Sequence, residues 1–239
     1  GSAASDECRI DSIAQSWGVI SGVAAPDRRK RAMEALWKYL VRPQDRLMAL
    51  FAPPFVNAPH DPGYIKGYPA GIRENGGQYT HGVLWAVAAF CHMGDGDRAG
   101  ELFAMLNPVN HGRSQPLAQR YRVEPYVACG DVYSVPPHVG RGGWTWYTGS
   151  AAWMYRVAVE YMLGLRFAGT KLYLEPVIPS HWPRFEATVR KNGCILKIAV
   201  ENPSGLCCGM GEMADQFWGN RCGTSLDPEG YRWTIATHK

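Results

Sequence analysis

Apolar residues along the chain fall into helical segments of two kinds. Segments 26–41 and 97–106 are amphipathic, whereas 10–21, 82–93 and 150–163 are apolar on most or all faces. A helix that is apolar all round is buried, and a helix with a single apolar stripe lies on the outside of a domain. The alternation predicts an inner ring of helices wrapped by an outer ring, as in an α/α toroid.

Two long connections interrupt the helical pattern, at about 42–80 and 107–148, and both are rich in Gly, Pro, aromatic residues and His. Connections of this length inside a compact domain usually carry function. Each one runs into an apolar, inner helix, so both should gather at the end of the toroid where the inner N-termini point. We expect the functional site at that end.

The C-terminal third has the pattern of strands rather than helices. Runs 171–176 and 194–200 alternate in part, Asn192-Gly193 is suited to a two-residue hairpin turn, and 233–236 is predicted to be a last strand. The sequence therefore predicts strands joined by tight turns in this part of the chain.

These patterns divide the chain into parts. Residues 1–4 are interpreted as a tag remnant and lead-in, 5–165 as a partial α/α barrel, and 166–239 as a small β-sandwich-like domain. The fold class is thus mainly α. Segment 203–224, rich in Gly and Cys and without a clear pattern, is expected to be poorly ordered.

Two junctions between loop and helix carry the most informative residues. Segments 74–81 and 144–153 each run from a polar, Gly-containing loop into an apolar helix, and each places a Thr, Thr80 or Thr148, where the helix should start. Helix N-termini attract anions through free N–H groups and the helix dipole. If the two helices pack side by side, the helix starts, His81 and a hydroxyl face one pocket suited to phosphate.

The charge of the chain excludes one class of partner. The formal net charge is only +4, which gives no reason to expect nucleic acid binding. The basic run 28–31 lies on an amphipathic helical pattern, so a solvated helix face is the favoured interpretation, with an acidic partner as the alternative.

The sequence has no metal or membrane signature. Its seven cysteines include no Cys-x-x-Cys pair and no zinc spacing, which favours reduced, mostly buried thiols; pairing among Cys207, Cys208 and Cys222 stays open. No apolar run is long enough to cross a bilayer. We expect a cytoplasmic location, either as a free protein or as the cytoplasmic domain of an inner-membrane protein.

Four longer motifs in order along the chain, at 9–17, 62–81, 123–127 and 142–155, resemble glycoside hydrolase family 94. These are the inverting disaccharide phosphorylases together with the C-terminal module of cyclic β-1,2-glucan synthase. The residues of the first and last motifs are most similar to those of the cyclic β-1,2-glucan synthase branch. The resemblance extends over residues 8–202. It implies an (α/α)6 barrel followed by a C-terminal β domain, and homodimers for the complete enzymes.

The resemblance also implies a reaction, phosphorolysis with inversion of a β-linked glucose oligosaccharide to give glucose 1-phosphate. Phosphate takes the place of the water and of its activating carboxylate in an ordinary inverting glycosidase. The protein then needs cationic and hydrogen-bonding groups to hold a dianion in line with the bond. No cofactor is expected, because inorganic phosphate is a substrate.

By motif, the family's functional residues map onto five positions. His81 and Thr148 resemble the residues that bind phosphate, and Glu74 resembles the carboxylate that binds hydroxyls of the sugar in subsite −1. Tyr68 and Arg73 fall where the family contacts the acceptor sugar of subsite +1. Three of them also have a structural interpretation: a capping or solvated role for His81, a plain N-cap for Thr148, and an ion pair with Arg73 or Lys66 for Glu74.

Further candidates rest on residue type and loop position alone. Arg141, between two glycines, could supply a cation for phosphate, although a loop Arg is more often a surface residue. Trp144 and Trp146 could stack on sugar faces as aromatic residues do in sugar sites, or pack into the core, and Trp146 is chosen as the candidate for sugar binding.

Two family features are absent from the sequence. The general acid of the family lies in an Asp-Trp-Asn-Asp-like motif that is expected upstream of the segment present here, and no Gln that would help to bind phosphate occurs at 129–131. No catalytic acid is therefore assigned, and the isolated chain is expected to be inactive. We expect it to pair with the missing N-terminal part of the barrel or to self-associate.

Two alternatives stay open at this level. The first is an inverting (α/α)6 glycoside hydrolase, in which Glu74, Glu124 or Asp131 acts as acid or base on water. The second is an inactive fragment that binds glucan.

Overall fold

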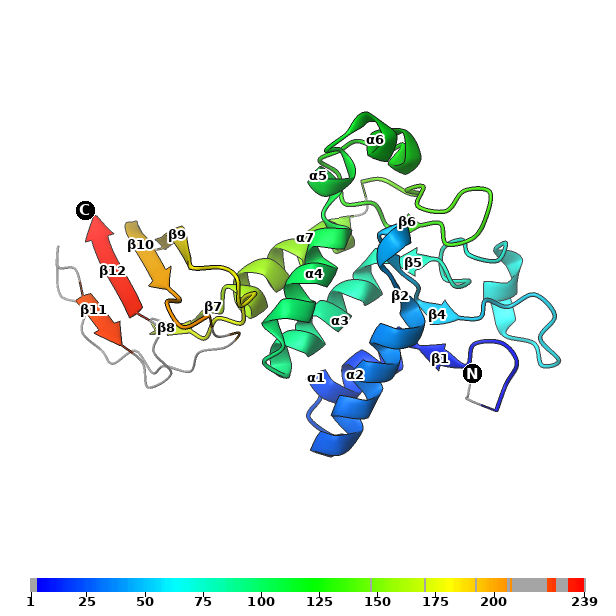
Figure 1. Cartoon of the computed structure of the whole chain (residues 1–239), viewed down its shortest axis with the longest axis horizontal. Coiled ribbons are helices and arrows are strands. Elements are labelled where there is room, and N and C mark those ends of the chain that lie inside the picture. Colours follow the sequence, from blue (N-terminus) through cyan, green and yellow to red (C-terminus); the bar gives the residue numbers. More distant parts are fainter. Residues whose placement is uncertain are drawn as a thin grey trace. The chain divides into compact units, whose positions relative to one another are not determined.

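The computed structural model describes residues 4–146, 148–169, 171–191, 193–205, 207, 223–226 and 232–238. Its contacts divide the chain into two compact units (Figure 1), one of Gly1–Met93 with Glu101–Val157, the other of Gly94–Gly100 with Ala158–Lys239. The predicted boundary between a barrel part and a β domain at residue 165 stays a prediction.

The predicted helices are present, with shifted ends. The α-helices are α1 (Ser12–Ile20), α2 (Pro26–Leu40), α3 (Thr80–His92), α4 (Gly96–Leu106), α5 (Pro108–His111), α6 (Gln115–Tyr121) and α7 (Thr148–Arg156), and α7 is followed by a π-helical stretch, Val157–Met162. Helices α5 and α6 lie inside what the sequence suggested was a long loop. In the described part of the chain the helices do not close a complete (α/α)6 barrel.

Local sequence explains where the first helices begin. The Asp11 carboxylate accepts hydrogen bonds from the backbone N–H groups of Ile13 and Ala14, at 2.7 and 3.2 Å, and so caps α1. Pro26 occupies the first turn of α2, where its missing N–H costs nothing. The buried residues of α2 are Met33, Leu36 and Leu40, one stripe at helical spacing, as expected for an outer helix.

Helix α3 lies between two neighbours, packed against α1 on one side and α7 on the other (Figure 1). Most of its residues are buried, as predicted from its apolar sequence. The same prediction is wrong for α7, because Ala151 and Ala152 are exposed and Tyr155 is 73% exposed. Packing against α3 covers one side of α7 and leaves the side with these three residues open.

Short antiparallel pairs fasten the long loops to the helix ends. The pairs are β1 (Ile10–Asp11) with β4 (Phe51–Ala52), β2 (Val41–Arg42) with β3 (Leu47–Met48), and β5 (Gln78–Tyr79) with β6 (Asp131–Val132). Two 3₁₀ turns, Pro43–Asp45 and Gly63–Gly67, lie in the first long connection. The β5–β6 pair brings the two long connections together directly before α3.

The second unit contains the predicted strands. A hairpin of β7 (Leu165–Ala168) and β8 (Lys171–Leu174) accompanies a four-stranded antiparallel sheet in the order β11 (Gly223–Leu226), β12 (Arg232–His238), β10 (Cys194–Glu201) and β9 (Arg184–Lys191). Its core is Leu165, Leu174, Ile178, Phe185, Ile198 and Val200.

Two strand predictions are confirmed in this unit. Lys191 pairs with Cys194, so the β9–β10 hairpin turns through two residues as the Asn-Gly pair predicted. The predicted last strand lies within β12. Most of segment 203–224, expected to be poorly ordered, lies outside the described residues.

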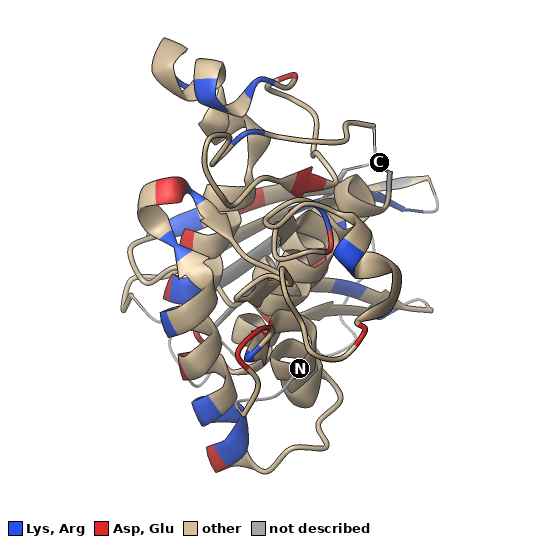
Figure 2. Ribbon diagram, turned by 90° about the vertical axis from the view of Figure 1, so that its right-hand side faces the viewer, with Lys and Arg blue, Asp and Glu red and all other residues tan. Residues whose placement is uncertain are grey.

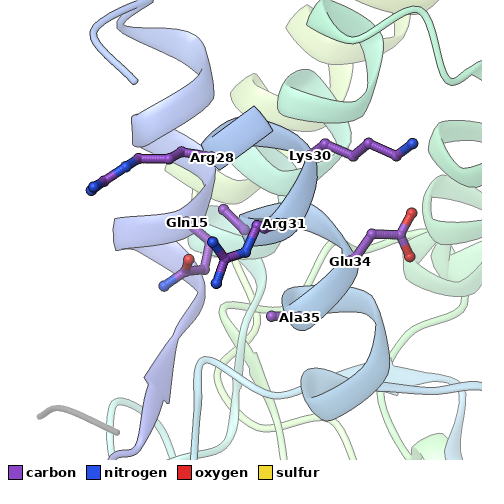
Figure 3. A pocket seen from close by; sticks show the side chains of 7 residues that line it. Gln15, Arg28, Lys30, Arg31, Glu34 and Ala35 are labelled. Carbon is purple, nitrogen blue, oxygen red and sulfur yellow. The ribbon is translucent and has the colours of Figure 1, made fainter. Parts of the chain in front are cut away.

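Charged residues of both signs are interspersed along the chain (Figure 2). In the basic run of α2, the side chains of Arg28 and Arg31 point to one side of the helix and that of Lys30 points to the other (Figure 3). All three line an open surface hollow together with Gln15 of α1. Arg29 instead turns back and donates to the Gly22 carbonyl oxygen at 2.6 Å. The four basic side chains therefore do not form one continuous patch on the helix. No helix within the described ranges is both long enough and apolar enough to cross a membrane.

Candidate functional site

The start of α3 is fixed by the strand pair that precedes it. Gln78 pairs with Val132 and Tyr79 with Asp131, and the Thr80 N–H donates to the Gly130 carbonyl oxygen at 3.0 Å. The next residue is His81, in the first turn of the helix. Backbone pairing between two distant loops therefore sets the position of this imidazole.

A buried amide supports the same junction. The Gln78 side chain accepts the Met48 N–H at 3.2 Å and donates to the Thr80 hydroxyl oxygen at 3.2 Å. Helix α3 begins at Thr80, as predicted, but Tyr79 is the N-cap residue and its side chain makes no cap hydrogen bond. The Thr80 hydroxyl is buried with Gln78, so it stabilises the connection between β5 and α3 and is not available to bind an anion.

The His81 imidazole lies in an aromatic pocket beside the first turn of α7. Its ring centroid is 5.0 Å from that of Trp85, 6.0 Å from that of Trp153 and 6.3 Å from that of Tyr79. A Cβ atom added to Gly149 would lie 3.4 Å from both Cε1 and Nδ1 of the imidazole. The two apolar helices therefore meet at His81, as their side-by-side packing predicted.

Burial sets the protonation of His81. Desolvation by its surroundings lowers the pKa of the imidazole below the ordinary value of 6.5. A neutral imidazole has one N–H donor and one acceptor nitrogen. At neutral pH this side chain can therefore donate one hydrogen bond to an anion, next to the N-terminal N–H groups of α3.

Helix α7 begins at Thr148, as predicted, and Thr148 directly precedes the glycine that contacts His81. The Thr148 side chain lies outside what the structure describes. The backbone thus brings the starts of the two helices together, and the placement of the hydroxyl remains a prediction.

A second group of predicted residues meets beside this junction. The Arg73 guanidinium lies 3.7 Å from the centre of the Trp144 ring and 5.6 Å from that of the Tyr68 ring. Cation–π contact holds a cation against an aromatic face. Tyr68 and Arg73, predicted to contact the acceptor sugar, are therefore neighbours. Their aromatic partner is Trp144, whereas Trp146, the tryptophan chosen from the sequence, is 72% exposed and has a left-handed φ of 60°.

Glu74 directly follows Arg73 in the same loop and lies close enough to Asp131 for its charge to raise the pKa of that carboxyl group. Its Oε2 atom is buried and has no hydrogen-bond partner. A bound molecule that donates a hydrogen bond to this oxygen would satisfy it. The adjacent Asn75 is fully buried and donates to the carbonyl oxygens of Phe55 and Tyr68, at 2.9 and 2.8 Å. These bonds hold the loop that presents Tyr68, Arg73 and Glu74.

Asp131 is the buried carboxylate of the site. Its Oδ2 accepts the Arg73 N–H at 3.2 Å and its Oδ1 accepts the Trp144 N–H at 3.0 Å. Burial raises the pKa of this carboxyl group, and the nearby Glu74 charge raises it further, against the lowering effect of the two N–H bonds and of Arg73. The sequence pointed to Asp131 only as one of three loop carboxylates, with no sign of this contact pattern.

Arg141 occupies a neighbouring hollow. It lines an open depression of about 540 Å³ together with Trp144, Tyr133 and Glu124, and a second of about 330 Å³ with Arg120 and other residues of the α6 end. Its predicted contact with phosphate stays a prediction.

The described residues give no sign of a metal site: they contain no cluster of three or more His, Cys, Asp and Glu side chains. Cys8, Cys91 and Cys129 are buried and Cys207 is half-buried, and none of these four described cysteines forms a disulfide. Cys208 and Cys222, considered for pairing, lie outside the described residues.

Comparison with known proteins gives a consistent set of relatives. Residues 1–164 match the family model of the glycosyl hydrolase 94 superfamily, catalytic domain. The chain is 53% identical over 204 residues to the cyclic beta-(1,2)-glucan synthase NdvB of Rhizobium meliloti (strain 1021), an alignment of 85% of this chain and 7% of the relative.

Phosphorylases are among the other relatives. The chain is 32% identical over 212 residues to N,N'-diacetylchitobiose phosphorylase of Vibrio proteolyticus, covering 88% of this chain and 26% of that protein. It is 29% identical over 218 residues to solabiose phosphorylase of Paenibacillus borealis, covering 88% and 27%. The chain thus spans about a quarter or less of the length of these relatives.

Proposed function

The chain belongs to the glycosyl hydrolase 94 family, and from this premise we propose that it is part of an inverting carbohydrate phosphorylase. The enzyme cleaves β-linked glucose oligosaccharides with phosphate and releases glucose 1-phosphate. The names of the relatives support both halves of the proposal, since one is a β-1,2-glucan synthase and others are phosphorylases.

The observation that carries the proposal is the meeting of His81 with the start of α7. Two helix N-termini and one imidazole donor at a single point form an anion site, because free N–H groups and helix dipoles favour negative charge. Aromatic rings lie beside His81, and the partial burial of its imidazole strengthens a hydrogen bond to a bound dianion. Thr148 is proposed to add its hydroxyl to the same phosphate.

In this mechanism phosphate attacks the anomeric carbon of the donor sugar from the face opposite the glycosidic oxygen. The bond to that oxygen breaks as the new C–O bond to phosphate forms, and a general acid outside these residues protonates the leaving oxygen. A β-linkage therefore gives α-glucose 1-phosphate. The protein groups at His81 and the two helix starts position the dianion and stabilise its charge.

The sugars are proposed to bind beside the phosphate. The unpartnered Oε2 of Glu74 would accept hydrogen bonds from hydroxyl groups of the donor sugar. The acceptor sugar would lie against Tyr68, Arg73 and Trp144, where a cation and two rings are already assembled.

Asp131 is the weaker candidate for a base in the hydrolytic alternative, because each of its carboxylate oxygens already accepts a backbone N–H. Glu74 keeps an unpartnered Oε2 and is the stronger candidate. The nature of the product therefore decides between phosphate and water as the nucleophile.

Product analysis of the complete protein tests the proposal. With a β-1,2-linked glucose oligosaccharide, glucose 1-phosphate should form only when phosphate is present. Equal cleavage with and without phosphate, yielding free glucose, would sink the proposal. The chain of 239 residues alone should give no turnover, and glucose 1-phosphate from the purified chain would contradict that expectation.

A further inference from the structure

Asp131 joins two loops that the sequence places far apart. One loop carries Arg73 and the other carries Trp144, and a single carboxylate accepts one backbone N–H from each. The side chains of those same two residues form a cation–π contact. With Tyr68 they make up the surface proposed to contact the acceptor sugar, called here the acceptor wall. The carboxylate and the stack therefore fasten the same pair of residues, one through the backbone and the other through the side chains.

We propose that Asp131 is a positioning residue for the acceptor sugar, one that holds Arg73 and Trp144 in the arrangement the sugar contacts. The inference rests on the proposed function and assigns Asp131 no contact with substrate. It predicts that the residue governs affinity for the acceptor sugar and leaves affinity for phosphate unchanged.

Two backbone features point to a carboxylate built into this place. Arg73 has a left-handed φ of 50°, an uncommon conformation for a residue other than Gly, Asn or Asp, and its N–H is bonded to Asp131. Gly143 leaves room for the same carboxylate, because a Cβ atom at that position would overlap Oδ1 of Asp131. The Asp131 carboxylate thus bonds the strained backbone of Arg73 on one side and occupies the space left by the absent side chain of Gly143 on the other.

The phosphate side of the site is held by different bonds. The start of α3 depends on the backbone pairing of β5 with β6 and on the Thr80 N–H bond to Gly130. Asp131 is itself the β6 residue that pairs with Tyr79, but this pairing uses its backbone, which replacement of the side chain leaves in place. The side chain of Asp131 therefore fixes the acceptor wall, and its backbone belongs to the bonds that fix the start of α3.

Replacement of Asp131 by Asn should separate positioning from folding. An amide keeps the shape but has one acceptor oxygen, so its NH₂ group would face one of the two N–H donors. The buried charge is lost at the same time, which offsets part of the cost to the fold. Charges facing the carboxyl group are Arg73 and Glu74, and neither changes in this variant.

The test measures initial rates in the complete protein, with a β-1,2-linked glucose disaccharide and phosphate varied in turn. For Asp131→Asn we expect the KM for the disaccharide to rise about tenfold while the KM for phosphate stays within about twofold. Gly143→Ala should give the same pattern, and the double variant should be no worse than the stronger single one.

Asp97→Asn is the matched control, since the Asp97 carboxylate also accepts a backbone N–H, from Ser180 at 2.7 Å, in the second unit. It should alter neither KM. An unchanged disaccharide KM in folded Asp131→Asn, or an equal rise in both KM values, would overturn the proposal.

Binding gives a readout independent of turnover. Disaccharide binding, followed by tryptophan fluorescence without phosphate, should weaken by about the same factor in Asp131→Asn. If the wild-type protein forms no glucose 1-phosphate, the proposed function fails; the binding measurement then still decides the role of Asp131, and equal binding by both proteins refutes it.

Discussion

At the scale of residues, the site depends on a histidine that its surroundings keep neutral. Rings of Tyr79, Trp85 and Trp153 lie beside His81, and partial burial lowers the pKa of the imidazole below 6.5. In the proposed site the neutral imidazole would donate a hydrogen bond to phosphate without carrying a charge of its own. The positive field would come instead from the helix starts.

Titration of His81 tests this description. Followed by NMR in the chain without phosphate, its midpoint should lie below 6.5. Added phosphate should raise the midpoint, because a nearby dianion favours the imidazolium form. A midpoint at or above 6.5 without phosphate, or one that phosphate does not move, would count against an anion site here.

The sequence predicted those site residues that lie in continuous motifs. His81 was predicted from its place at a helix start, and Tyr68 and Arg73 from the family resemblance of the segment that contains all three residues. Asp131 could not be found this way, since its partners are 58 and 13 residues away. The choice between Trp144 and Trp146 depended on backbone conformation, in particular the left-handed φ at Trp146, which no local pattern indicates.

At the scale of elements, a buried histidine joins two helices that the sequence did not predict. His111 ends α5 and stacks on Tyr121, which ends α6, with ring centroids 4.3 Å apart. Burial, together with the charges of Arg46 and Arg120, lowers the pKa of His111 to about 4. The neutral His111 ring therefore has a structural role, holding the end of α5 against the end of α6.

His111 should make stability depend on pH. Its folded-state pKa lies below the unfolded value of 6.5, so its contribution is fully present above 6.5 and is lost as the pH falls towards about 4. The full loss is about 3 kcal/mol. Urea unfolding should show a smaller acid destabilisation for His111→Phe than for wild type, and His60→Phe, at an exposed position, should match wild type. Identical pH dependence in all three would contradict the assignment.

The cap of α1 is a second element-level test. Asp11→Ala removes two hydrogen bonds from the helix start and should lower the free energy of unfolding by about 1 kcal/mol. Asp27→Ala, which removes an exposed first-turn charge from α2, should cost less, because no cap hydrogen bond is lost. Equal losses measured by urea unfolding would show that Asp11 acts through charge alone.

Elements were predictable where they present a long apolar pattern. Helices α1 to α4 follow such patterns, and so do the strands of the β9–β10 hairpin. Helices α5 and α6 are too short to show a period, and their packing depends on the His111–Tyr121 stack. The stretch Val157–Met162 after α7 was predicted as a helix, but the apolar pattern does not distinguish the i→i+5 hydrogen bonds of a π-helix from those of an α-helix.

At the scale of the whole molecule, the open side of α7 should drive association. Ala151 and Ala152 are exposed on this helix, and Tyr155 is 73% exposed on the same side. Exposed apolar surface of this kind often marks a protein contact. We expect the chain to self-associate in light scattering, and Tyr155→Lys to reduce association more than Tyr126→Lys, at an equally exposed loop tyrosine. A monodisperse wild-type monomer would contradict this expectation.

We propose that His81 and the start of α7 bind the phosphate that attacks the sugar. The most direct test is the dependence of glucose 1-phosphate formation on phosphate in the complete protein carrying His81→Asn, beside His60→Asn as control. We expect the KM for phosphate to rise at least about tenfold in His81→Asn, with the KM for the oligosaccharide within about twofold of wild type. An unchanged phosphate dependence in His81→Asn would contradict it.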